Sequence, residues 1–304
     1  MRAFQAAGFQ QRSLETKWGK MVYSVPDASF YPPNVSEAIP LVFLHSLGGG
    51  SSAYEWSKVY PTFASNYNVI APDLIGWGDS AHPVKKYSAE DYLEIIKLLL
   101  ENVAKKPAWV VASSLTAGLV IRLAISEPQL FRGLFLVSPS GYRDFSEDYQ
   151  EEFASQLINL PGLDRLIYAV GAGNEWAVRN FLEQFLFADT SRLSEEVVEA
   201  YLTSALKPNA EYAALASLKG DICFDLAQYM GDLNTPTSLV WGSQSRFSRP
   251  EKGKRLANLN QGAIAQFHIV PGTGVLPHLE TPAVVSGLLA STIIRSSREE
   301  SGRN

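Results

Sequence analysis

Ser114 is a residue whose type and position could support nucleophilic chemistry. It follows an apolar run at residues 108–111 that is typical of a buried strand, and residues 115–125 resemble a helix. A serine hydroxyl is a poor nucleophile at neutral pH unless an imidazole accepts its proton and a carboxylate orients that imidazole. The chain has only four histidines, so the candidates for the base can be examined almost exhaustively.

The elements around Ser114 predict an α/β fold. Strand-like and helix-like segments alternate, which is typical of a mostly parallel, doubly wound sheet covered on both faces. Further buried strands are expected at residues 41–44, 68–71, 134–137, 238–241 and 267–270. Ser88 and Asp91 form a capping box for a helix over residues 89–105. Pro282 suits the first turn of a last helix that reaches about Arg295.

About a hundred residues between two of these strands have a different composition. They are aromatic and acidic, with helical periodicity at residues 149–158 and 195–206 and no buried-strand pattern. We therefore predict an α/β core at 1–140 and 234–304, with a helical cap inserted at 141–233. The aromatic residues of this segment are expected mainly to form the cap core, although some could line a pocket for an apolar ligand: Phe153, Trp176, Phe181, Phe185 and Phe187.

Four more motifs each follow a predicted strand. They are His45-Ser46-Leu47-Gly48-Gly49-Gly50, residues 73–80, residues 241–245 and residues 274–282. In this order, and together with the Ser114 turn, they resemble the α/β-hydrolase family of the single-chain type with a helical cap. The resemblance implies hydrolase ancestry, with a nucleophile at Ser114 on a sharp strand-to-helix turn. It also implies an oxyanion hole built from the backbone amides near Leu47 and Leu115.

The chain departs from the family pattern at the positions of the other triad residues. The acid position is Ser245, which cannot stabilise an imidazolium by charge, and the base position is Val275, which cannot accept a proton. The family's G-x-S-x-G turn has Ala112 and Thr116 in place of its glycines, which adds bulk where strand and helix pack closely. We therefore predict a degenerate triad in which Ser114 is either vestigial or an unconventional nucleophile.

None of the four histidines replaces the missing base on sequence grounds. His45 belongs to the oxyanion loop, His82 is expected at the surface, and His268 lies inside the last strand. His278 comes three residues after the base position, at the start of a helix, and would ordinarily point elsewhere. Asp144 follows a strand after which some family members place their acid, but an acid without a base does not restore acyl transfer.

Three kinds of function stay open. We favour a non-catalytic protein that binds a small apolar molecule or a protein partner in a pocket between core and cap. The second is an active esterase- or lipase-like hydrolase, or a lyase, that uses Ser114 with a non-standard base. The third is an assembly subunit with the acidic cap as its interface. The candidate pocket-lining residues are His45, Ser113, Trp77, Phe181 and His278.

The composition of the chain limits which partners, cofactors and cellular compartments are expected. The net charge of −5 over 304 residues provides no basic surplus for a nucleic acid. No metal-ligand motif is present, and no cofactor is expected. Cys223 is the single cysteine, so no intrachain disulfide can form. The chain has no apolar run of about 18 residues and no signal-like start, so we expect the cytoplasm or another reducing soluble compartment.

Overall fold

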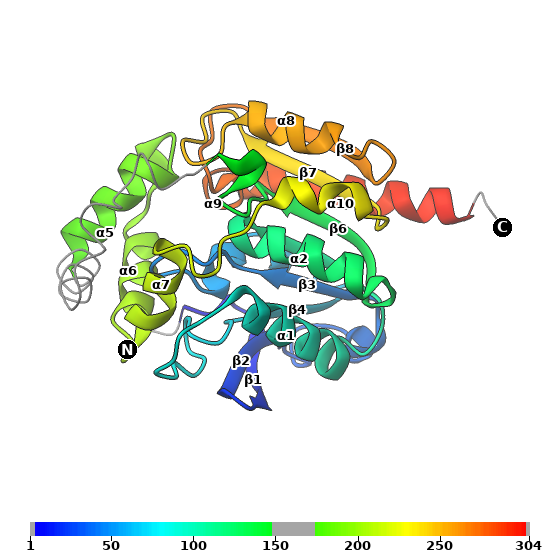
Figure 1. Ribbon diagram of the computed structural model, residues 1–304. Coiled ribbons are helices and arrows are strands. Elements are labelled where there is room, and N and C mark those ends of the chain that lie inside the picture. Colours follow the sequence, from blue (N-terminus) through cyan, green and yellow to red (C-terminus); the bar gives the residue numbers. More distant parts are fainter. Residues whose placement is uncertain (1–3, 148–173, 302–304) are drawn as a thin grey trace.

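A computed structural model describes residues 4–147 and 174–301 of the chain. Within this part, one eight-stranded sheet has the order β1-β2-β4-β3-β5-β6-β7-β8 (Figure 1). An antiparallel hairpin, β1 (Phe9–Thr16) and β2 (Gly19–Pro26), pairs with the antiparallel β4 at one edge. The other strands are parallel: β3 (Pro40–Leu44), β4 (Asn68–Pro72), β5 (Ala108–Ser113), β6 (Phe131–Val137), β7 (Thr237–Gly242) and β8 (Ile264–Val270). The predicted fold class and the six predicted strands are confirmed, whereas the hairpin was not predicted.

Helices cover both faces of the sheet. Side chains from α1 (Ala89–Leu99), α2 (Ser114–Ser126) and α8 (Pro250–Asn258) pack in one core cluster, and α10 (Pro282–Ser301) packs in the cluster on the other face. The capping box of α1 is confirmed, with Ser88 and Asp91 each bonding the other's backbone N–H. The predicted extension of α1 to residue 105 is a π-helical turn, which ends where Lys105 takes a left-handed conformation with φ 60°.

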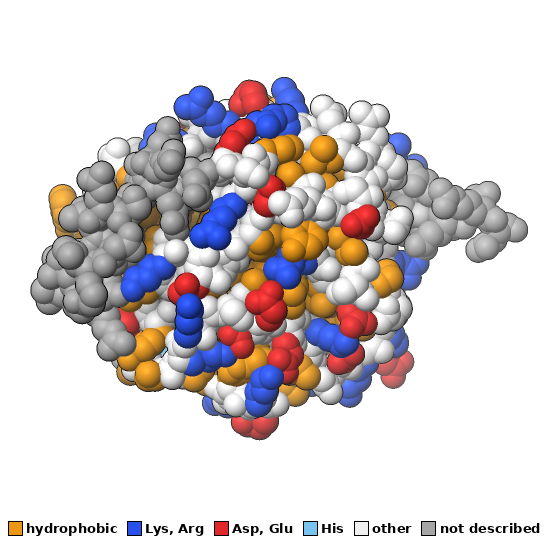
Figure 2. All heavy atoms as spheres, in the orientation of Figure 1, with side chains coloured by type: hydrophobic (Ala, Val, Ile, Leu, Met, Phe, Trp, Pro, Cys, Tyr) orange, Lys and Arg blue, Asp and Glu red, His pale blue; other side chains and the backbone are white. Residues whose placement is uncertain are grey.

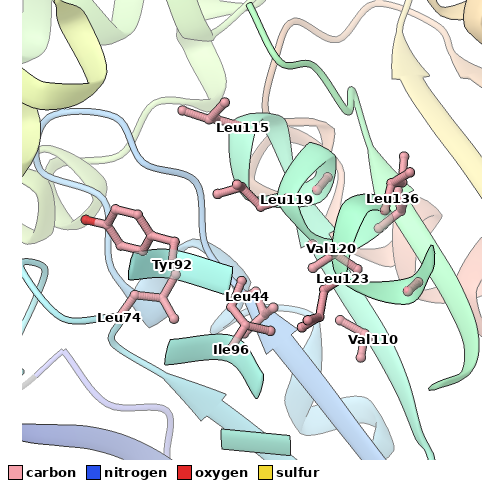
Figure 3. Close-up of a cluster of buried hydrophobic side chains, with 14 of the residues drawn as sticks. Leu44, Leu74, Tyr92, Ile96, Val110, Leu115, Leu119, Val120, Leu123 and Leu136 are labelled. Carbon is pink, nitrogen blue, oxygen red and sulfur yellow. The ribbon is translucent and has the colours of Figure 1, made fainter. Parts of the chain in front are cut away.

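The core explains why the parallel strands are continuous apolar runs in the sequence. Both faces of the central strands β3 and β5 are buried, so a polar residue has no exposed side to occupy there. Figure 3 shows Leu119, Val120 and Leu123 of α2 gathered with Val110 of β5 and Leu44 of β3 in the larger core cluster. This packing fixes the start of α2, and hence Ser114, at the end of β5.

The segment between β6 and β7 is helical in its described part. It contains α5 (Glu175–Phe181), α6 (Glu195–Ala205) and α7 (Ala210–Leu218), which lie beyond one end of the sheet (Figure 1). The predicted helix at 149–158 and Phe153 lie outside the described residues. A Cβ on Gly50 would lie 2.6 Å from the Tyr201 carbonyl oxygen, so α6 rests directly on the loop after β3.

The surface carries charges of both signs. Figure 2 shows Lys and Arg interspersed with Asp and Glu on the displayed face. Among the helices of the described residues, none combines the length and the apolar character needed to cross a bilayer.

Candidate functional site

Ser114 occupies a strained turn at the carboxyl end of β5. It is the first residue of α2 and has φ 55°, in the left-handed region that costs a non-glycine residue about 1–3 kcal/mol. Gly118, one turn later, allows close approach of the β6–α5 loop, since a Cβ there would lie 2.7 Å from the Ser140 carbonyl oxygen. The sharp turn therefore forms with Ala112 and Thr116 in place of the family glycines.

The partner of the Ser114 hydroxyl is a second hydroxyl. Its Oγ lies 2.8 Å from the Oη of Tyr142, a residue that sequence analysis did not identify. Burial raises the pKa of Tyr142 to about 12, so this phenol is neutral at neutral pH and cannot take the proton of a serine. The sequence carries no motif that marks Tyr142, because the contact depends on the path of the loop after β6.

Asp144 holds the loop that positions Tyr142. Its carboxylate accepts hydrogen bonds from Ser140 Oγ at 2.6 Å, Gly141 N at 2.9 Å and Leu226 N at 3.1 Å. Burial raises the pKa of Asp144, and these three donors oppose that shift. The candidate acid of the sequence analysis therefore anchors a loop and bonds no imidazole.

Three of the four histidines bond to backbone or to a neighbouring side chain. His45 accepts from the Leu74 N–H through Nε2 at 2.9 Å, which leaves Nδ1 to donate to the Ser46 carbonyl at 2.6 Å. His82 is half-buried, and its Nε2 lies 3.0 Å from the Gly78 carbonyl oxygen. His268 contacts the Gln266 amide oxygen at 3.3 Å. None of these three rings bonds Ser114.

His278 is the fourth histidine, and it is a buried, neutral imidazole. Its ring stacks on Trp56, with centroids 4.0 Å apart and planes 14° apart. Within the described residues neither ring nitrogen has a hydrogen-bond partner. Burial lowers the pKa of His278 to about 4, although the charge of Glu55 acts in the opposite direction. Its ring is therefore also not bonded to Ser114.

The buried His278 predicts a loss of stability in acid. Its pKa falls from an ordinary 6.5 to about 4 on folding, so between these values the unfolded chain binds the proton first and acid favours unfolding. Relative to His278→Phe, which keeps a ring against Trp56, the wild-type unfolding free energy should fall by up to about 3 kcal/mol from pH 6.5 to pH 4. Urea unfolding at a series of pH values measures this difference. Parallel curves for the two proteins would contradict it.

The predicted acid and base positions, Ser245 and Val275, lie on adjacent loops. Gln244 N donates to the Thr273 carbonyl at 2.9 Å, which joins the segment of Ser245 to that of Val275. Ser245 is buried, and its Oγ has no hydrogen-bond partner in the part of the chain that the structure describes. Val275 packs in an apolar cluster with cap residues such as Leu186. The scaffold thus keeps both positions together at the carboxyl ends of β7 and β8.

Glu55 is a second site residue that sequence analysis missed. It lies in the short turn η2 (Ala53–Trp56), and it is fully buried. Its Oε2 accepts from Ser46 N at 2.8 Å and from Ser113 Oγ at 3.5 Å. Its Oε1 accepts from Ser46 Oγ at 2.8 Å and from Tyr201 Oη at 2.9 Å. The available signal was a charged residue between two large aromatic residues, Tyr54 and Trp56.

Of the remaining predicted site residues, two have backbone N–H groups that could act as hydrogen-bond donors, and two pack against other aromatic side chains. Leu47 and Leu115 are buried, and within residues 4–147 and 174–301 their backbone N–H groups donate to no acceptor. Trp77 lies in the main core and donates through Nε1 to Tyr92 Oη at 2.8 Å. Phe181 of α5 is half-buried and contacts Phe185, with ring centroids 5.6 Å apart. The Leu47 and Leu115 amides therefore have no acceptor in the described part of the chain, and their role as an oxyanion hole stays a prediction.

The sheet order and the serine on a left-handed strand-to-helix turn define the α/β-hydrolase class of proteins. The sequence matches the model of the alpha/beta hydrolase family over residues 41–288. The chain belongs to this family.

Relatives and solved structures agree with this assignment. An uncharacterized protein of Mycobacterium tuberculosis is 34% identical, with 80% of this chain and 72% of that protein covered. The uncharacterized hydrolase YugF of Bacillus subtilis is 26% identical, with 83% and 89% covered. The carboxylesterase CesB of B. subtilis has a TM-score of 0.75 at 18% identity, covering 95% of this chain and 93% of that one. At this identity, the structural likeness shows the fold alone.

Proposed function

We propose that this protein is a non-hydrolytic member of the family that binds a small apolar molecule between the core, 1–140 and 234–304, and a cap at 141–233. The observation that carries the proposal is the 2.8 Å contact of Ser114 Oγ with Tyr142 Oη, since none of the four histidines bonds that serine. Acyl transfer needs a base at the nucleophile, whereas ligand binding needs only donors and apolar surface. Binding of a protein partner in the same place is the alternative form of this proposal.

The chemistry of the candidate site residues supports this proposal. Tyr142, with a pKa of about 12, is a hydroxyl donor and not a base. The base position is Val275, which belongs to one apolar cluster with Val178 and Leu182 of the cap segment. A site in which hydroxyls and amides adjoin an apolar cluster suits a ligand that has a small polar end and a hydrocarbon body.

A serine-directed fluorophosphonate probe tests the absence of catalysis. We expect no covalent labelling of the wild type under conditions that label a competent serine hydrolase to completion, because Ser114 has no base. Native mass spectrometry of the purified chain should then show a non-covalently retained apolar molecule. Stoichiometric labelling that disappears in Ser114→Ala would overturn the proposal.

A second candidate function is slow hydrolysis through Ser114 with a non-standard base. The left-handed Ser114 and the available Leu47 and Leu115 amides favour it, because an intact oxyanion hole and substrate binding alone leave roughly 10³-fold assistance over water. Relatives described as hydrolases, such as the pyrrolizixenacetamide deacetylase of Xenorhabdus hominickii at 23% identity, keep this candidate open. Ester hydrolysis that is equal in wild type and Ser114→Ala would exclude it.

A further inference from the structure

We propose that Glu55 is a specificity-determining residue that restricts the Ser114 site to ligands with an uncharged, oxygen-bearing end and excludes carboxylates. The inference rests on the proposed ligand-binding function and adds to it the chemical class of the ligand.

Glu55 brings a negative charge into the buried part of the site. All four groups that contact its carboxylate are hydroxyl or amide donors, from Ser46, Ser113 and Tyr201. Among the described residues, no Lys, Arg or His forms an ion pair with Glu55. Donors of this kind hold a carboxylate in place, but they carry no full positive charge to cancel its field.

Two residues next to Ser114, Ser113 and Tyr142, connect it to Glu55. Ser113, the residue before Ser114, donates to Glu55, and Tyr142, which bonds the Ser114 hydroxyl, also experiences the Glu55 charge. All of these groups are buried or half-buried, so water screens their interactions weakly. A ligand carboxylate placed at Ser114 would therefore face a like charge without a cation to offset it.

The donors beside Ser114 favour an acceptor oxygen on the ligand. The Leu47 and Leu115 amides have no acceptor within the described part of the chain. When Tyr142 donates to Ser114, the Ser114 hydroxyl hydrogen is a third donor. An amide, ketone, ester or alcohol oxygen can accept these bonds without bringing a charge. The hydrocarbon part of such a ligand would lie along the cluster that contains Val275 and Phe181.

A matched ligand series tests the inference. Binding of decanamide, decanol and decanoate to the wild-type chain is measured by calorimetry at about pH 8, where a carboxylic acid is ionised. The three ligands share one hydrocarbon length, so differences in affinity report the polar end. We expect decanamide and decanol to bind at least ~10-fold more tightly than decanoate, because only decanoate meets the Glu55 charge.

The variant Glu55→Gln removes the charge at nearly constant size. We expect it to bring the affinity for decanoate to within about threefold of that for decanamide. Tyr201→Phe is the matched control, because it removes one donor to Glu55 and keeps the charge, so the preference for decanamide should persist. Thermal unfolding verifies that both variants are folded. If one variant does not fold, the affinities of the wild-type chain for decanamide, decanol and decanoate still test the inference.

The binding results distinguish a failure of the Glu55 role from a failure of the proposed ligand-binding function. Equal wild-type affinities for decanoate and decanamide overturn the role of Glu55 and leave ligand binding standing. An undiminished preference in a folded Glu55→Gln variant also overturns it. If no member of the series binds, the proposed ligand-binding function fails, and this inference fails with it.

Discussion

The double substitution Ser245→Asp with Val275→His is expected to raise ester hydrolysis at least ~10²-fold above the wild type, because a positioned general base contributes about 10²–10⁴-fold. The two positions lie on loops joined by the bond from Gln244 N to the Thr273 carbonyl, at 2.9 Å. The left-handed Ser114 already has the backbone conformation of a strand-to-helix nucleophile. The substitution therefore adds an acid and a base to loops that lie together near a serine in the backbone conformation of a nucleophile.

Tyr142 should limit this gain. Its Oη competes with a new imidazole for the Ser114 hydroxyl, because the two oxygens are 2.8 Å apart. Adding Tyr142→Phe to the double variant should therefore raise the rate further. Each single substitution should have little effect, since a histidine without its acid is poorly oriented and an acid without a base accepts no serine proton.

Hydrolysis of p-nitrophenyl butyrate, with fluorophosphonate labelling in parallel, measures the result. Ser114→Ala in the background of the double variant is the control, and it should return the rate to that of the wild type. If the folded double variant is no faster than the wild type, the residues at 245 and 275 alone do not account for the absence of hydrolysis. The bulk of Thr116 in the turn would then be the next position to change.

The second large effect is on stability. Gly242→Ala is expected to lower the free energy of unfolding by about 3 kcal/mol or more, because overpacking against atoms that cannot move is strongly destabilising. A Cβ at this position would lie 1.9 Å from the Gly274 carbonyl oxygen and 2.5 Å from that of Thr273. Both atoms belong to backbone, so no side-chain rotation relieves the clash.

Gly287→Ala is the matched control for this substitution. Gly287 lies in α10, and a Cβ there would meet nothing within 4 Å, so alanine should gain up to about 1 kcal/mol of helix propensity. Urea unfolding of both variants measures the contrast. Equal stabilities would show that the loop after β8 can move away from the end of β7. The close joining of positions 245 and 275 would then be in doubt.

The fold was largely predictable from the sequence because its central strands are buried on both faces. A short apolar run such as residues 41–44 is readily interpreted as a strand of a parallel sheet that is buried on both faces. The hairpin β1–β2 escaped prediction because β1 is mostly exposed and has no such run. Helix α8 escaped because its nine residues are mostly polar and bury only one side, which leaves few apolar positions to show a period.

The sequence by itself determined which residues stand at the predicted acid and base positions. Motif order predicts Ser245 and Val275 there, and the chain contains only four histidines; neither motif order nor residue counts need coordinates. The partners of Ser114 were decided by tertiary structure alone. Tyr142 bonds Ser114 across 28 positions, and Glu55 bonds Tyr201 across 146. No local periodicity encodes such contacts, because they arise only when the ends of several strands and the helices over them pack together.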